Sequence, residues 1–129
     1  MSKLLILDNM GEPLSLITYF LETKNYVVKT VHDTIQLFSE LSSFQPDLLV
    51  LGTLSAHMEA VEICRKLRSR RDTRSLGILL CCNEPADVAK FRMIGADDFI
   101  EKPFNLTVLS EKVRSLLSWL PIRRRALGE

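Results

Sequence analysis

The chain has 129 residues, of which 47% are hydrophobic and 26% are charged, and its formal net charge at pH 7 is +1. This length fits one domain with a hydrophobic core of its own, and the high apolar content with a small net charge argues against a disordered chain. The charge balance argues against nucleic-acid binding driven by bulk charge, and no apolar run approaches the ~20 residues that a membrane-spanning helix needs.

Short apolar runs alternate with amphipathic stretches along the chain. In chain order, the runs predict strands at Lys3–Leu7, Tyr26–Val31, Leu48–Leu51, Gly77–Cys82 and Asp98–Ile100. Each strand is followed by apolar residues at helical spacing, which predict a helix. In the same order these stripes are Leu14, Ile17 and Leu21; Ile35, Phe38 and Leu41; Val61, Cys64 and Leu67; Val88, Phe91 and Ile94; and Leu109, Val113, Leu116 and Leu117.

Five strands that alternate with five helices indicate an α/β fold of the (βα)5 type. The strands are apolar throughout, which is typical of a doubly wound parallel sheet with helices on both faces. We expect one domain over residues 1–120. Pro121 and the run Arg123–Arg125 then predict a frayed C-terminal tail over 121–129, or the start of a linker to an output domain.

The cysteines and histidines indicate neither a disulfide framework nor a zinc site. Three cysteines are an odd number, so a reducing, cytoplasmic setting is the simpler interpretation. Cys81 and Cys82 are adjacent and lack a C-x-x-C spacing, while His32 and His57 are isolated. We expect Cys64 to lie in the core because it belongs to an apolar stripe.

The ends of the predicted strands are where a functional site is expected. In a parallel α/β sheet, sites gather at the carboxyl ends of the strands. The residues at those ends are Asp8, Asn9, Gly52, Cys81, Cys82 and Lys102.

Four segments of the chain resemble the receiver domain of bacterial two-component response regulators. They are KLLILDN at 3–9, PDLLVLG at 46–52, EICRKLR at 62–68 and IGADDFIEKPF at 94–104. The last segment is the most specific, and the resemblance runs from residue 3 to about residue 118. It implies a flavodoxin-like fold with strand order 2-1-3-4-5 and a role in phosphorelay signal transduction.

The chain departs from the family at the positions that carry phosphoryl chemistry. In the family, two acids after the first strand and an acceptor aspartate after the third hold Mg2+. A hydroxyl and a lysine then contact the phosphoryl group. At the matching positions this chain has Asp8 and Asn9, Gly52, Cys81, and Lys102.

Glycine at the acceptor position predicts that the usual aspartyl phosphate does not form. Two alternatives stay open. One is a phospho-accepting switch that uses a displaced acid, Glu12 or Asp8, and the other is a flavodoxin-like domain that senses a small ligand in the emptied pocket. No residue set offers a base, a nucleophile and an oriented partner, so we do not expect an enzyme.

The metal site is also expected to be lost. Mg2+ favours oxygen ligands, usually one or two carboxylates with a substrate phosphate. Asp8 is beside the neutral Asn9, and Lys102 is a nearby cation that would neutralise it. We expect an ion pair between Asp8 and Lys102, weak or absent Mg2+ binding and no other cofactor.

The expected function is therefore that of a pseudo-receiver, a protein interaction module that works without phosphorylation. Phe99 matches the aromatic switch position of the family and is expected to pack in the protein. In the family that the chain resembles, the face of the fourth helix, fifth strand and fifth helix is the usual contact surface. Here it would serve a protein partner, an output domain or a homodimer. Nucleic acid and membrane are not expected partners. The charged residues expected on this face are Lys90, Arg92, Asp97, Asp98, Lys112 and Arg114.

Overall fold

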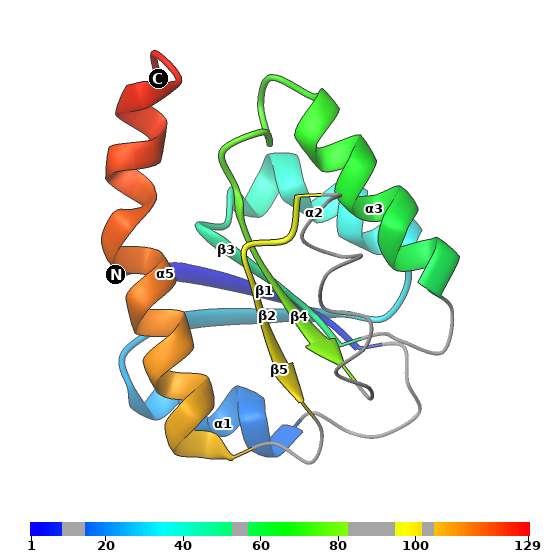
Figure 1. Cartoon of the computed structure of the whole chain (residues 1–129). Helices are drawn as coiled ribbons and strands as arrows, with labels where there is room; N and C mark the ends of the chain where they lie inside the picture. The colour runs from blue at the N-terminus through cyan, green and yellow to red at the C-terminus, as the bar shows by residue number, and fades with distance from the viewer. Residues whose placement is uncertain (9–14, 53–56, 83–94, 102–104) are drawn as a thin grey trace.

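The structure is a computed structural model that describes residues 1–8, 15–52, 57–82, 95–101 and 105–129. Strands and helices alternate along the chain (Figure 1). The strands are β1 (Lys3–Leu7), β2 (Val27–Val31), β3 (Leu48–Leu51), β4 (Gly77–Cys82) and β5 (Asp98–Glu101). The helices are α1 (Ser15–Thr23), α2 (Thr34–Phe44), α3 (His57–Ser69) and α5 (Leu106–Ala126).

The strands form one five-stranded parallel sheet in the order β2-β1-β3-β4-β5. This confirms the predicted fold class and strand order. The register places Leu7 beside Leu51 and Leu51 beside Leu80, so the carboxyl ends of β1, β3 and β4 lie in one row.

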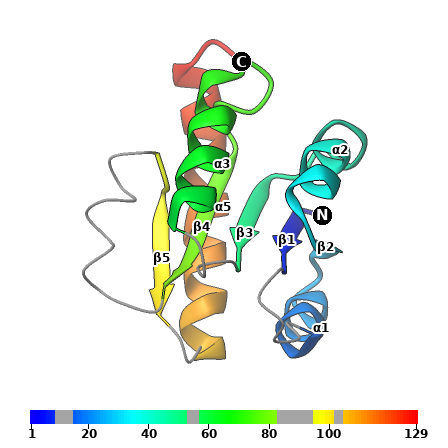
Figure 2. The same cartoon turned by 90° about the vertical axis from the view of Figure 1, so that its right-hand side faces the viewer.

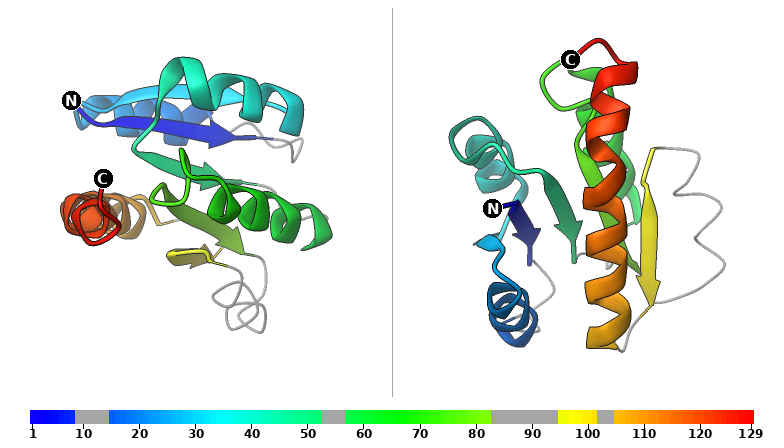
Figure 3. Two further views of the ribbon diagram at one scale, coloured as in Figure 1. Left: turned by 90° about the horizontal axis from the view of Figure 1, so that it is seen from above. Right: turned by 90° about the vertical axis from the view of Figure 1, so that its left-hand side faces the viewer.

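Helices cover both faces of the sheet. Helices α2 and α3 lie on one face, and α1 and α5 lie on the other (Figures 2 and 3). Helix α5 packs along β3, β4 and β5 and also contacts α1. None of the described helices is long and apolar enough to cross a membrane.

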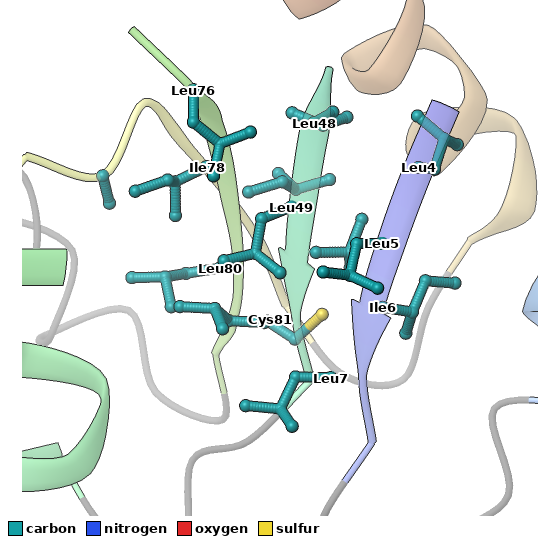
Figure 4. Close-up of a cluster of buried hydrophobic side chains, with 14 of the residues drawn as sticks. Leu4, Leu5, Ile6, Leu7, Leu48, Leu49, Leu76, Ile78, Leu80 and Cys81 are labelled. Atoms are coloured by element: carbon teal, nitrogen blue, oxygen red, sulfur yellow. The ribbon is translucent and has the colours of Figure 1, made fainter. Parts of the chain in front are cut away.

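The core is built from the strands themselves. Every side chain of Leu4–Leu7 and Leu48–Leu51 is at most 2% exposed, because helices cover the sheet on both sides (Figure 4). Helix α5 contributes one apolar stripe to this core, consisting of Leu109, Val113, Leu116 and Leu120. The predicted core position of Cys64 is confirmed, since its side chain is fully buried.

The predicted stripe of the second helix is wrong at Ile35, whose side chain is 83% exposed. Leu41 faces the core as predicted and Phe38 packs partly buried against it, but Leu37 takes the place of Ile35. Helix α2 begins after Asp33, whose carboxylate accepts a hydrogen bond from the backbone N–H of Gln36. Four residues separate Leu37 from Leu41, so both lie on one face and Ile35 turns toward solvent.

The predicted frayed tail is also corrected, because α5 continues through Pro121 to Ala126. Two arginines of its last turns hold it to the body of the protein. Arg123 donates to the carbonyl of Leu76 at 3.2 Å, and Arg124 forms an ion pair with Asp47 at 3.3 Å. The linker stays a prediction. The fourth predicted helical stripe, and Leu14 of the first, lie outside the described residues.

Candidate functional site at the carboxyl edge of the sheet

Three of the predicted site residues come together where the central strands end. Each follows directly after a residue of the Leu7, Leu51 and Leu80 row: Asp8 after β1, Gly52 after β3, and Cys81 on β4. Backbone hydrogen bonds continue the pairing there. The N–H of Gly52 donates to the carbonyl of Leu7 at 2.9 Å, and that of Asp8 donates to Val31 at 2.8 Å.

The chemistry of this row differs from residue to residue. Asp8 is half-buried and supplies a carboxylate, whereas Gly52 is buried and has no side chain. Cys81 is 2% exposed and supplies a thiol near the end of β4 (Figure 4). Cys81 is therefore a small, buried side chain at this edge of the sheet. Among these three described residues, Asp8 has the one carboxylate, and Gly52 beside it has no side chain.

Several predicted residues fall outside the described part of the chain. These are Asn9, Glu12, Lys90, Arg92 and Lys102, together with the side chains of His57 and Cys82. The ion pair between Asp8 and Lys102 thus stays a prediction. Within the described residues, no group of three or more His, Cys, Asp or Glu side chains could hold a metal ion.

His32 is a neighbour of this row that sequence reasoning missed. Its Nδ1 atom lies 3.1 Å from the backbone carbonyl oxygen of Asp8, and its backbone N–H donates to Oε1 of Gln36 at 2.8 Å. The position of His32 in the sequence indicates this location, because His32 directly follows β2 just as Asp8 follows β1. The strand-end rule, applied to the second strand as well, would have included it.

Phe99 is 6% exposed, which confirms that this aromatic packs in the protein. It lies beside Leu80 in the register of β4 and β5. It also lines a shallow hollow of about 300 Å³ between β5 and α5. The other residues that line the hollow are Ile100, Glu101, Asn105, Val108 and Lys112.

The prediction that Asp97 belongs to an exposed contact face is wrong. Its side chain is 9% exposed and forms salt bridges with Arg68 and Arg123, and it also accepts the backbone N–H of Ile78 at 2.8 Å. Arg68 donates as well to the carbonyl of Gly95 at 2.9 Å. We call Arg68, Asp97 and Arg123 the Asp97 cluster.

The remaining described residues of the predicted face do lie toward solvent. Asp98 and Lys112 form an ion pair at 3.0 Å, with side chains 28% and 30% exposed, and Arg114 is exposed. Asp98 and Lys112 join β5 to α5, and Lys112 also lines the hollow beside Phe99. The face of β5 and α5 therefore combines a hollow with charges of both signs.

Comparison with known proteins places the chain among signalling proteins. Residues 4–114 match the family model of the response regulator receiver domain. The nisin biosynthesis regulatory protein NisR of Lactococcus lactis is 36% identical over 114 residues, which are 88% of this chain and 49% of that protein. PhoP of Bacillus subtilis, an alkaline phosphatase synthesis transcriptional regulatory protein, is 28% identical over 115 residues, or 89% and 48% of the two chains. The chain spans about half the length of these curated relatives.

Solved structures give the same result. The signal receiver domain of a signal transduction histidine kinase from Syntrophus aciditrophicus is 30% identical with a TM-score of 0.78, over 92% of this chain and 91% of that one. A response regulator receiver domain from Bermanella marisrubri has a TM-score of 0.81 at 24% identity, over 91% and 99% of the two chains, which supports the fold.

Proposed function

The chain belongs to the response regulator receiver domain family of two-component signalling, and on this premise we propose that it signals without forming the usual aspartyl phosphate. The observation that carries the proposal is Gly52, which directly follows β3 and matches the acceptor position of the family. It is buried between Asp8 and Cys81 in the row of strand ends. The proposed role is that of an interaction module in the bacterial cytoplasm and not of an enzyme.

The chemistry of phosphoryl acceptance supports this proposal. A carboxylate oxygen of the acceptor must attack the phosphorus atom while the donor leaves, and glycine offers no such oxygen. Cys81 supplies a buried thiol beside Gly52, and it is the thiolate form of cysteine that acts as a nucleophile. Asp8 supplies a carboxylate on the far side of Gly52 from β4.

The described donor set does not suit Mg2+. This ion favours hard oxygen ligands in octahedral geometry. Asp8 is the one carboxylate that the described row offers, Gly52 offers none, and the sulfur of Cys81 is a soft ligand. We therefore propose that the domain keeps one conformation when Mg2+ is added.

A signalling domain that needs no phosphate must act through a surface that is always available. We propose the face of β5 and α5 for this contact, with a protein partner, an output domain or a second copy of the chain. The hollow beside Phe99 would receive an apolar side chain, and the Asp98–Lys112 pair and Arg114 would set the orientation. Exposed ion pairs contribute ~0–1 kcal/mol each, so these charges would give specificity more than affinity.

Phosphoryl transfer can be tested directly. The chain is incubated with acetyl phosphate and Mg2+, and intact-protein mass and release of phosphate by hydroxylamine are measured. We expect no covalent phosphate on the natural chain. The matched variant Gly52→Asp restores the acceptor carboxylate, and a measurable hydroxylamine-sensitive phosphate on this variant would show that the assay detects the chemistry.

A stoichiometric acyl phosphate on the natural chain would overturn the proposal. Loss of that phosphate in Glu12→Gln or Asp8→Asn would then identify a displaced acceptor. The contact face is tested separately by sedimentation of the natural chain and of Val108→Glu, with Glu22→Lys on α1 as the control. A dimer that persists in Val108→Glu would argue against the face of β5 and α5 as the dimer contact.

A further inference from the structure

Basic side chains are concentrated in two short segments of a chain whose net charge is only +1. Residues 65–74 and 123–125 together hold nine of the 17 lysines and arginines. Eight of these nine are arginines. They are Arg65, Lys66, Arg68, Arg70, Arg71, Arg74, Arg123, Arg124 and Arg125.

The two segments meet at one end of the molecule. Helices α3 and α5 both end at the side opposite the carboxyl ends of the strands (Figures 1 and 2). The loop after α3 is bound to the end of α5. Arg74 donates to the carbonyl of Leu127 at 2.8 Å and forms a salt bridge with Glu129 at 3.1 Å. We call this surface the basic end.

Five of the nine cations at the basic end form salt bridges, and they share four carboxylates. Arg68 and Arg123 bind Asp97, and the other three pairs are Arg70–Asp72, Arg74–Glu129 and Arg124–Asp47. The other four are exposed and form no salt bridge with a carboxylate of the described residues. These four are Arg65, Lys66, Arg71 and Arg125.

We propose that the basic end binds the phosphodiester backbone of a nucleic-acid duplex without reading its sequence. Arginine presents a planar fork of N–H donors that matches the oxygens of a phosphate. Clustering of such cations on one surface is the electrostatic footprint of backbone binding, even where the net charge of the protein is small.

The composition of the basic end favours nucleic acid over an acidic protein. The centre of a protein interface is typically apolar and depleted in charged residues. No large hydrophobic side chain of residues 65–74 is exposed, so this segment offers charge with no apolar centre. Binding to a phosphate backbone needs no apolar centre, because it is driven by the release of counterions.

The same surface is a poor membrane anchor. An interfacial helix buries a broad apolar face in the lipid. The apolar stripe of α5 already packs against the sheet, and near its end Trp119, Ile122 and Leu127 are the exposed large hydrophobic side chains. Three side chains do not form the broad apolar face that an interfacial helix buries.

The experiment measures the anisotropy of a fluorescein-labelled 20-base-pair duplex of random sequence at several salt concentrations. Four exposed cations without a salt bridge to a described carboxylate predict a slope of about −3.6 in a plot of log affinity against log salt. Between 50 mM and 200 mM salt the affinity should then fall about 150-fold. Two duplexes of unrelated sequence should bind equally.

The triple variant Arg65→Ala, Arg71→Ala and Arg125→Ala removes three of these four cations. At 50 mM salt we expect its affinity to fall by more than about 100-fold and its slope to approach about −1. The control Lys24→Ala removes an exposed cation outside the basic end and outside the face of β5 and α5, and it should bind like the natural chain. All four residues are exposed, so thermal melts should confirm that both variants fold.

Absence of binding at 50 mM salt, or equal binding by the triple variant, would overturn the proposal. Tighter binding to poly-glutamate or to phosphatidylserine vesicles than to the duplex would overturn it in favour of an acidic protein or a membrane. The phosphorylation test of Gly52 concerns the opposite edge of the sheet, so either proposal can fail without the other.

Discussion

The substitution Asp97→Asn tests how much the Asp97 cluster contributes to stability. Asparagine has nearly the same shape, keeps an oxygen for the N–H of Ile78, and removes the charge between two arginines. Arg68 and Arg123 have side chains that are 20% and 16% exposed, so water can solvate them only in part. Burial already lowers the pKa of Arg68, and the Asp97 carboxylate opposes that shift.

The expected loss follows from this burial. Removing one partner of a buried ion pair costs about 3–5 kcal/mol, because a charge is left without compensation. The two arginines keep some exposure and also donate to the carbonyl of Leu76, which favours the lower end, about 3 kcal/mol. For a chain of 129 residues this loss corresponds to a decrease in Tm of roughly 10 °C.

Urea unfolding followed by circular dichroism gives the free energy of unfolding of each variant. The matched control is Asp72→Asn, which breaks the Arg70–Asp72 pair, whose side chains are 41% and 59% exposed. That change should cost at most about 0.5 kcal/mol. A loss below about 1 kcal/mol for Asp97→Asn, or one equal to the control, would refute the view that this cluster holds α3, β5 and α5 together.

Three further predictions concern single side chains. Burial raises the pKa of the Cys64 thiol to about 11, so the folded state holds this proton more tightly than the unfolded state. The protonated Cys64 thiol therefore contributes fully to stability below about pH 9, and this contribution is lost as the pH rises toward 11. The free energy of urea unfolding of Cys64→Ala should depend less on pH in that window. Gly77→Ala should cost about 1–3 kcal/mol in urea unfolding, because the new Cβ would lie 2.7 Å from Cδ1 of buried Leu48; an unchanged free energy would mean that this leucine moves aside. Asn105→Ala should lower Tm and cost about 1 kcal/mol, since its side chain caps α5 through the N–H of Val108, whereas Asn105→Asp should retain the cap.

The architecture could be predicted from the sequence because its causes are local. The runs Leu4–Leu7 and Leu48–Leu51 have no polar residue on either face, which requires a sheet covered on both sides. The stripe Leu109, Val113 and Leu116 likewise repeats at the helical period, so it identifies the buried face of α5. At Ile35 the predicted stripe was wrong, because Leu37 and Leu41, which are four residues apart, define the face of α2 that packs against the core.

Part of the candidate site was also predictable. The row of Asp8, Gly52 and Cys81 follows from the strand ends together with the parallel register. Glycine has no side-chain carboxylate, so the sequence alone establishes that Gly52 lacks one. His32 directly follows β2, so the strand-end rule places it at this edge, but its contact with the Asp8 carbonyl, 24 residues away in the sequence, is visible only in the fold.

The sequence by itself thus determined the strands, most of the core and the chemical nature of the residue at the acceptor position. The tertiary structure alone decided which charges are available at the surface. Asp97 and Asp98 are adjacent in the sequence, yet one is bound by Arg68 and Arg123 and the other lies toward solvent with Lys112. The physical reason is that the burial of a side chain follows the local periodicity of the sequence. The pairing of charges depends instead on contacts between residues 26 and 29 positions apart, and only the packing of α3 and α5 brings these residues together.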